Sequence, residues 1–426
     1  MSSGLSINIK LSFLLLLIFV TGSCKKKSDL DENNYSIPVV KLTLNENHLW
    51  STDSGLYVIG TNGITYGCSQ LANYNQKWEF PAHIEYKENG IIGFSDDVGF
   101  RIKGKCSRNN SMKSIGIYWR SKYGNKKLEY PIFSSNTSTY KRLFLRNSGN
   151  DFGKTQIKDA SISMIFKNYA NVEFQEYKPA VLYLNDEYWG IYNLREMITP
   201  HHFKYKYGVT KSEVEILEGC ELSPKADDGS INDFMTEVID FISENNLSDN
   251  QNYQVISNLI DIDSYMDYII INTYIFNSDW PCGNAKWWRE PTSSDYEKWK
   301  WIVYDTDFAF KKENVSKIWI GNLYGNTISL DKANGFFIFN NLIKNDDFLQ
   351  LFLNRYLYFI DVVFVKNRVK TIIKENQNLI ESEYINHQNK WNTLPERKWN
   401  NSVNEMIEFN DTRNAIMRTA IKKLQK

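Results

Sequence analysis

Apolar and polar residues alternate over short runs in the first part of the chain, and turn residues separate these runs. A period of two is typical of strands that bury one face. We therefore expect a β-rich subdomain over residues 36–105, built as an antiparallel or sandwich-like layer. Its expected strands are the alternating runs 39–44, 82–86 and 99–105 and the apolar run 55–60.

The pattern becomes mixed over residues 106–225, where strand-like and helix-like runs follow one another. The clearest signal is two apolar runs, 180–184 and 188–194, separated by a polar triplet that suits a tight turn. These runs predict a β-hairpin. Further strands are expected at 114–120 and 141–146, and a helix at 159–169.

Over residues 226–426 apolar residues recur mostly with helical spacing. The run 263–276 is apolar on most sides and indicates a buried helix, whereas 299–304 indicates a strand. The other expected helices lie at 231–245, 336–343, 348–374 and 406–424. The whole pattern predicts an α+β fold with an N-terminal β-rich layer and a C-terminal helical bundle.

Residues 1–23 predict an export signal. Lys10 precedes an apolar run that is too short to span a bilayer. The run ends in Gly22-Ser23-Cys24, which resembles the lipobox of bacterial lipoproteins, where cleavage precedes a lipidated cysteine. The alternative is a plain signal peptide with an incidental cysteine. Residues 24–35 are polar and predict a flexible tether, so we expect a lipid-anchored protein on the periplasmic or outer-surface face of the cell envelope.

The amino-acid composition argues against some classes of binding partner. The 50 basic residues balance the 50 acidic ones, so the chain lacks the basic excess typical of nucleic-acid binding. Aromatic residues make up 15% of the chain, which favours packed subdomains over disorder. Four cysteines besides Cys24 suffice for two disulfides, whose pairing the sequence leaves open: Cys68, Cys106, Cys220 and Cys282. His201 and His202 are adjacent and should point apart, which argues against a histidine metal site.

One group of residues has the composition and spacing of a catalytic site. Four residues separate Asp279 from Asn284, and a predicted strand then leads to Asp305 and Asp307. The same spacing occurs in the catalytic loop of protein kinases, where the Asp accepts the proton of the substrate hydroxyl and the Asn binds Mg²⁺. A carboxylate after the strand would supply another hard oxygen ligand. The alternative is a capped loop followed by a solvated turn.

Several ordered motifs together resemble the CotH kinase family, named for spore coat protein H, over roughly residues 37–395. The motifs are Pro38-Val39-Val40, Leu49-Trp50, Gly99–Arg108, Met112-Lys113-Ser114, Phe144–Asp151, Tyr183–Glu196, Asn277–Asn284 and Tyr304–Phe308. The resemblance implies an atypical protein-kinase-like core, with an N-lobe over 106–225 and a C-lobe over 226–426 that carries the acidic loop. It also implies ATP, Mg²⁺ or Mn²⁺, and transfer of phosphate to Ser or Thr of surface or secreted proteins.

By position, the resemblance makes Asp279 the catalytic residue, with Asn284 and either Asp305 or Asp307 on the metal. Lys113 becomes the candidate for binding the nucleotide phosphates, with Lys103 and Arg101, which share one face of a strand, as rivals. Glu196 becomes a candidate for pairing with that lysine or with the metal. The plainer alternatives are a solvated lysine and a charge at the start of a helix.

The chain departs from the family pattern at Tyr304, where tryptophan is usual, and at Lys311, where glycine is usual. ATP is scarce outside the cytoplasm, so a second function stays open: a catalytically inactive kinase-fold lipoprotein that binds proteins or glycans. In that case the adjacent Trp287 and Trp288 would form a binding platform, and the acidic loop would hold Ca²⁺ structurally.

Overall fold

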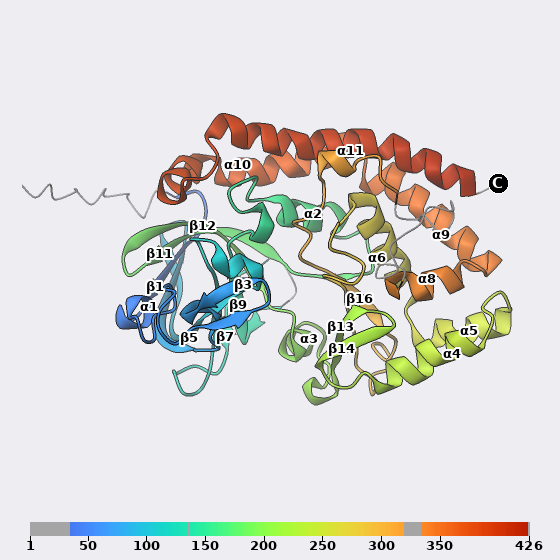
Figure 1. Ribbon diagram of the computed structural model, residues 1–426, viewed down its shortest axis with the longest axis horizontal. Coiled ribbons are helices and arrows are strands. Elements are labelled where there is room, and N and C mark those ends of the chain that lie inside the picture. Colours follow the sequence, from blue (N-terminus) through green and yellow to red (C-terminus); the bar gives the residue numbers. More distant parts are fainter. Residues whose placement is uncertain (1–34, 134–136, 319–333, 425–426) are drawn as a thin grey trace, which may run out of the picture.

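The computed structural model describes residues 35–133, 137–318 and 334–424. The expected signal peptide, the lipidation residue Cys24 and all but the last residue of the expected tether lie outside these ranges. The described part confirms the α+β class, with strands dominating its N-terminal half and helices its C-terminal half (Figure 1).

Seven strands close into a barrel in the order β1-β11-β12-β9-β6-β5-β4. They are β1 (Val39–Thr43), β4 (Phe80–Glu88), β5 (Ile91–Lys103), β6 (Ser114–Tyr118), β9 (Arg142–Arg146), β11 (Tyr177–Leu184) and β12 (Glu187–Glu196). Alternate residues of each strand point into one apolar core, as the period of two predicts. The expected hairpin is β11–β12, and Asn185 and Asp186 at its turn both have positive φ, the conformation that a two-residue hairpin turn requires.

The expected separate layer over 36–105 is wrong. β5 pairs with β6 across the expected boundary, and β1 pairs in parallel with β11, about 140 positions further along the chain. The sequence near each strand does not indicate which strand it pairs with, because the alternation of apolar and polar residues shows only which face of a strand is buried. Residues 55–60 form turns rather than a strand, with Leu56 buried as an anchor.

Two small hairpins and two disulfides complete the edges of the fold. The hairpin strands are β2 (Ile64–Tyr66), β3 (Ser69–Ala72), β7 (Leu128–Glu129) and β8 (Thr139–Tyr140). Cys68 pairs with Cys106 and fastens the β2–β3 hairpin to the segment after β5, and Cys220 pairs with Cys282.

A second sheet has the order β10-β16-β15-β13-β14. Its strands are β10 (Glu173–Phe174), β13 (Glu215–Cys220), β14 (Ser223–Asp228), β15 (Lys286–Arg289) and β16 (Lys300–Val303). The expected buried helix is α6 (Ile262–Ile275), and its side chains pack on this sheet. The other helices of this region are α4 (Phe241–Glu244), α5 (Asn250–Leu259), α8 (Phe337–Leu342) and α9 (Asp346–Tyr358).

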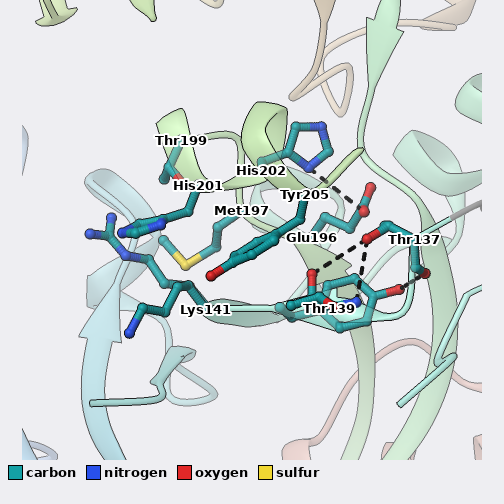
Figure 2. A pocket seen from close by; sticks show the side chains of 11 residues that line it. Thr137, Thr139, Lys141, Glu196, Met197, Thr199, His201, His202 and Tyr205 are labelled. Carbon is teal, nitrogen blue, oxygen red and sulfur yellow. Dashed lines mark hydrogen bonds and ion pairs between the residues drawn. The ribbon is translucent and has the colours of Figure 1, made fainter. Parts of the chain in front are cut away.

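Two short helices flank the junction between the barrel and the second sheet: α2 (Lys158–Phe166) and α3 (Pro200–Tyr207). On α3, His201 and His202 point to opposite sides, and His202 faces Glu196 (Figure 2). The expected divergence of the two histidines is therefore confirmed.

Two long helices, α10 (Lys366–Trp391) and α11 (Glu396–Leu424), run along both the barrel and the helical region (Figure 1). α10 docks on β12 through His387, whose Nδ1 accepts the backbone N–H of Ile191 at 3.0 Å. Gly190 permits this approach, because a Cβ there would lie 2.7 Å from Nε1 of Trp391. Within the described residues no single helix has the length and apolar composition of a membrane span; only the pair Asp346–Val363 and Lys366–Trp391, bent by 58°, passes when taken together.

Candidate active site

The two aspartates that follow β16 meet one arginine at the end of β9. Nη2 of Arg146 donates to Oδ1 of Asp305 at 2.5 Å and to Oδ2 of Asp307 at 2.7 Å. The side chain of Asp307 is 1% exposed and that of Asp305 is 32% exposed. The expected acidic pair is therefore held in place by a cation of the barrel.

Asp159, on the first turn of α2, fastens the same loop to the barrel. Its Oδ1 accepts hydrogen bonds from the backbone N–H and the hydroxyl of Thr306, both at 2.9 Å. Its Oδ2 accepts from Arg195 of β12 and lies 3.9 Å from Nε of Arg146. Thr306 is thus fixed between the two aspartates, and Asp305 has a left-handed backbone with φ of 52°.

Burial and charge act in opposite directions on these groups. Burial, followed by repulsion from Asp305, raises the pKa of Asp307 to about 8, although Arg146 opposes the shift. Burial also acts to raise the pKa of Asp159, but Arg195 and Arg146 outweigh it and hold that pKa below its usual range. Asp307 therefore carries the least compensated carboxyl group of the cluster.

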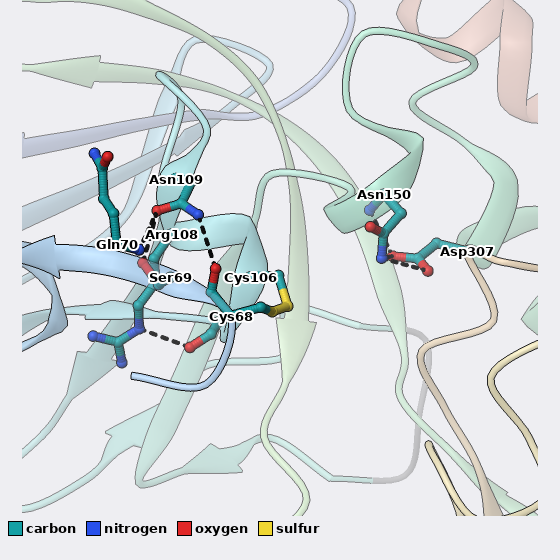
Figure 3. Close-up of a disulfide and its surroundings, with 9 residues drawn as sticks. Cys68, Ser69, Gln70, Cys106, Arg108, Asn109, Asn150 and Asp307 are labelled. Atoms are coloured by element: carbon teal, nitrogen blue, oxygen red, sulfur yellow. Dashed lines mark hydrogen bonds between the residues drawn. A yellow bond between two sulfur atoms is a disulfide. The ribbon is translucent and has the colours of Figure 1, made fainter. Parts of the chain in front are cut away.

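The loop after β9 approaches Asp307 so closely that it needs glycine. Asn150 donates its backbone N–H to Oδ2 of Asp307 at 2.8 Å, and its side-chain Nδ2 lies 3.3 Å from Oδ1 (Figure 3). Gly149 has φ of 59°, and a Cβ there would lie 2.1 Å from Oδ2 of Asp307 and 2.6 Å from Nη2 of Arg146. The Asn-Ser-Gly-Asn motif in the sequence is thus part of the site.

The segment from Asp279 to Asn284 lies against the same acidic loop. Asn284 donates through Nδ2 to the backbone carbonyl of Asp305 at 3.0 Å and to Oδ2 of Asp279 at 3.4 Å. Asp279 is exposed to solvent. The structure therefore brings together all four residues that the spacing singled out, with Asn284 as the bridge.

Several contacts hold this segment. Trp280 is fully buried and donates through Nε1 to the hydroxyl of Tyr268 on α6 at 2.7 Å. The Cys220–Cys282 disulfide fastens the segment to the end of β13. Lys311 lies with its Nζ 4.1 Å above the ring of Phe308 and 3.4 Å from Oγ of Ser278, so the residue that departs from the family pattern sits next to Asp279.

Lys113 is not placed to bind a nucleotide. Its Nζ donates to the backbone carbonyls of Arg108 at 2.7 Å and Asn110 at 3.1 Å, and it lies 3.8 Å from the centre of the Tyr74 ring. Burial, then the charge of Arg108, lowers its pKa to about 8. The sequence motif therefore marks a lysine that holds the 108–110 turn.

The expected pairing of Glu196 with Lys113 is also wrong, whereas its expected pairing with a metal stays a prediction. Glu196 pairs with Leu143 across β12 and β9, whereas Lys113 precedes β6 near the other end of β9, about four residues or roughly 13 Å away along the strands. Oε1 of Glu196 lies 3.7 Å from Nδ1 of His202 (Figure 2), and burial raises the pKa of this carboxyl group. Its Oε2 accepts the backbone N–H of Glu176 at 3.3 Å, so its neighbours are α3 and the start of β11.

Arg101 and Lys103, the rival candidates, lie on the outer face of β5, because the alternate residues Phe100 and Ile102 fill the barrel core. Burial, then the charges of Arg101, Arg108 and Arg142, lowers the pKa of Lys103 to about 8, and Asp227 of β14 opposes the shift. These cations therefore lie where the barrel faces the second sheet, and Nε of Arg101 is buried with no hydrogen-bond partner among the described residues.

Sequence reasoning missed the residues that organise the site, which are Arg146, Asp159, Arg195 and Asn150. Arg146, Asn150 and Arg195 belong to motifs quoted above for their resemblance alone, whereas Asp159 lies outside them. A basic residue able to pair with the acidic loop would have been the signal. The proposed Trp287–Trp288 platform is wrong, because both side chains are only 1% exposed. Trp288 stacks on Phe203 with ring centres 3.8 Å apart.

Across the described ranges, no group of three or more His, Cys, Asp or Glu side chains is arranged to hold a metal ion. The chemistry of the donors nevertheless fits Mg²⁺ or Mn²⁺, because Asp305, Asp307 and Asn284 offer carboxylate and amide oxygens around one loop. The raised pKa of Asp307 also favours a metal ion at this position, because a further cation would relieve the repulsion between the carboxyl groups of Asp305 and Asp307.

The geometry agrees with the comparison to known families. A family model described as CotH kinase protein matches residues 100–417, about three quarters of the chain. No curated protein sequence matches the chain. Because one family model covers well over half of the sequence and includes every residue of the acidic site, the protein belongs to the CotH kinase family and has a kinase-like fold.

Proposed function

We propose that the protein is an extracytoplasmic, ATP-dependent kinase that phosphorylates Ser or Thr residues of surface or secreted proteins. The observation that carries the proposal is the bridge made by Asn284, which joins the Asp279 carboxylate to the backbone of Asp305. It places an exposed carboxylate beside a pair of metal-type ligands, the arrangement that phosphoryl transfer to a hydroxyl requires.

Each residue then has a distinct role. Asp279 accepts the proton of the acceptor hydroxyl, because its carboxylate is exposed and borders the acidic loop. Asp305, Asp307 and Asn284 would hold the divalent ion, which neutralises charge on the nucleotide phosphates when bound. Arg146 and Asp159 orient that loop from the barrel side. Arg101 and Lys103 provide positive charge on the facing surface of the barrel.

The proposed location rests on the leader and on the cysteines. Cys24 follows a short apolar run as in bacterial lipoproteins, and four further cysteines form two disulfides, which persist in oxidising compartments. A lipid anchor at Cys24 would keep the domain at the cell envelope, next to protein substrates carrying Ser or Thr.

Transfer of label from γ-labelled ATP to a Ser-rich acceptor tests the function. We expect label on the acceptor with Mg²⁺ or Mn²⁺, none with a chelator, and none from the Asp305→Asn plus Asp307→Asn double variant. The double variant should also lose binding of Mn²⁺–ATP by equilibrium titration. If the double variant binds Mn²⁺–ATP as tightly as wild type, the metal site lies elsewhere. An inactive binding module would label nothing under any condition.

A further inference from the structure

A polar cavity of about 330 Å³ lies beside the junction of the barrel and α3. Four of the residues that line it have cationic side chains, Arg120, Lys122, Lys141 and Arg142, and His201 adds an imidazole. None of its lining residues in the described chain is Asp or Glu. It is distinct from the acidic loop, and nothing in the proposed catalytic roles uses it.

Positive charge in this cavity is only partly compensated. Glu79 accepts from Nε of Arg120 at 2.7 Å and from Nη2 at 2.8 Å, and it lies 3.5 Å from Nζ of Lys122. One carboxylate therefore serves two cations. Lys141 instead donates to backbone carbonyls, those of Trp119 at 3.3 Å and Lys126. Glu79 therefore occupies the fork of Arg120, whereas Arg142 forms no ion pair with a carboxylate of the described residues and lies with its guanidinium carbon 5.7 Å from the centre of the Tyr118 ring. A free guanidinium beside two further cations suits an anion.

The pKa shifts agree with a surplus of positive charge. Burial, then the charges of Arg120, Lys126 and Arg142, lowers the pKa of Lys141. Burial, then neighbouring cations that include Arg142 and Lys141, lowers the pKa of His201 to about 4. Figure 2 shows Lys141 and His201 on the same side of the adjoining hollow, with His202 turned away toward Glu196.

We propose that this cavity binds the phosphoryl group of a phosphorylated Ser or Thr in an extended protein segment. A phosphoryl group carries nearly two negative charges and three acceptor oxygens, and clusters of arginine and lysine recognise it in other phosphopeptide-binding proteins. The cavity volume is large enough for one such side chain with its solvent.

The position of the cavity favours a protein ligand that also reaches the active site. Arg142 and Arg146 are four positions apart on β9, and both point away from the barrel, because Leu143 and Leu145 fill its core. Their Cα atoms are therefore about 13 Å apart, the span of about four residues of extended chain. We therefore infer that the substrate is a protein segment that already carries a phosphorylated Ser or Thr near the residue to be phosphorylated. The role as a kinase substrate rests on the proposed function, whereas binding of the phosphorylated segment to the cavity does not.

Binding of a phosphoserine peptide to the purified chain, measured by calorimetry without nucleotide, tests the proposal. We expect the unphosphorylated peptide not to bind, and Arg142→Gln to weaken phosphopeptide binding at least tenfold. The side chain of Lys122 is 58% exposed, so Lys122→Gln should not disturb folding. This variant should weaken phosphopeptide binding several-fold. Arg397→Gln on the exposed surface of α11 removes the same charge and should leave binding unchanged.

Four results would overturn the proposal. The first three are equal binding of both peptides, equal loss in the Arg397 control, and full displacement of the peptide by Mn²⁺–ATP, which would assign the cavity to the nucleotide. Inorganic phosphate as the probe distinguishes a free anion from a phosphopeptide. Phosphate binding as tight as the peptide would mean a free-anion site and also count against it. Because no transfer is measured, failure here is separate from failure of the kinase function.

Discussion

Arg146→Met removes the cation that the two aspartates share while keeping a side chain of similar length. The cost follows from burial. Asp307 is 1% exposed and has a pKa raised to about 8, so at pH 7 it is mostly protonated and loses a hydrogen-bond partner, which at a buried site typically costs about 1–3 kcal/mol. Asp305 is 32% exposed, so water screens it and it adds at most about 1 kcal/mol. We expect the free energy of unfolding to fall by about 1–3 kcal/mol, mostly through Asp307.

Urea unfolding followed by tryptophan fluorescence at pH 7, without divalent ions, measures this change. Asp307→Asn added to Arg146→Met replaces the carboxyl group with a neutral amide whose oxygen can still accept from Asn150, so the double variant should regain part of the lost stability. Mn²⁺ should stabilise the single variant more than wild type, because the carboxylates no longer share a guanidinium. Arg397→Met is the matched control at an exposed site, expected within about 0.5 kcal/mol of wild type. A loss below about 1 kcal/mol, or a double variant no more stable than the single one, would refute the reasoning.

Three further variants probe other parts of the account. Gly149→Ala should abolish Mn²⁺–ATP binding in a titration, because its Cβ would lie 2.1 Å from Asp307; Gly208→Ala, also at positive φ but with nothing within 4 Å, should bind normally, and equal behaviour of the two would contradict the close-approach argument. Burial raises the pKa of Glu221 from 4.5 to about 8, so the folded chain retains a proton that the unfolded chain releases. Stability should therefore fall by about 1 kcal/mol per pH unit between pH 5 and pH 8, and urea unfolding of Glu221→Gln should show a flatter slope; an unchanged slope would count against it. Cys24→Ser should release the protein from membranes, and unchanged membrane partitioning with unchanged mature mass would rule out the lipid anchor.

The sequence predicted what short-range patterns determine. The β11–β12 hairpin and the buried helix α6 lie where periodicity indicated them. Asp279 and Asn284 meet because only four residues separate them, so a loop of that length is enough to set the contact. The grouping of the acidic loop with this segment followed from the resemblance to the family.

Contacts between distant segments were not predictable in the same way. Arg146 and Asp305 are 159 positions apart in the sequence, and the position of Arg146 depends on the closure of the barrel by the pairing of β1 with β11. Lys113 looked like a phosphate ligand because its motif matched, but its register places the ammonium group against backbone carbonyls. Burial and register, which no local pattern reports, decided both outcomes.

Asp279 is proposed to serve as the base of a phosphoryl transfer, and its replacement tests this role most directly. Asp279→Asn keeps the size of the side chain and leaves the metal ligands in place, so Mn²⁺–ATP should bind as to wild type. Transfer of label from γ-labelled ATP to Ser or Thr of an acceptor should fall by about 10²–10⁴-fold, the usual contribution of a general base. A folded, nucleotide-binding wild-type protein that labels neither itself nor any acceptor, or an Asp279→Asn variant that transfers at the wild-type rate, would contradict the account.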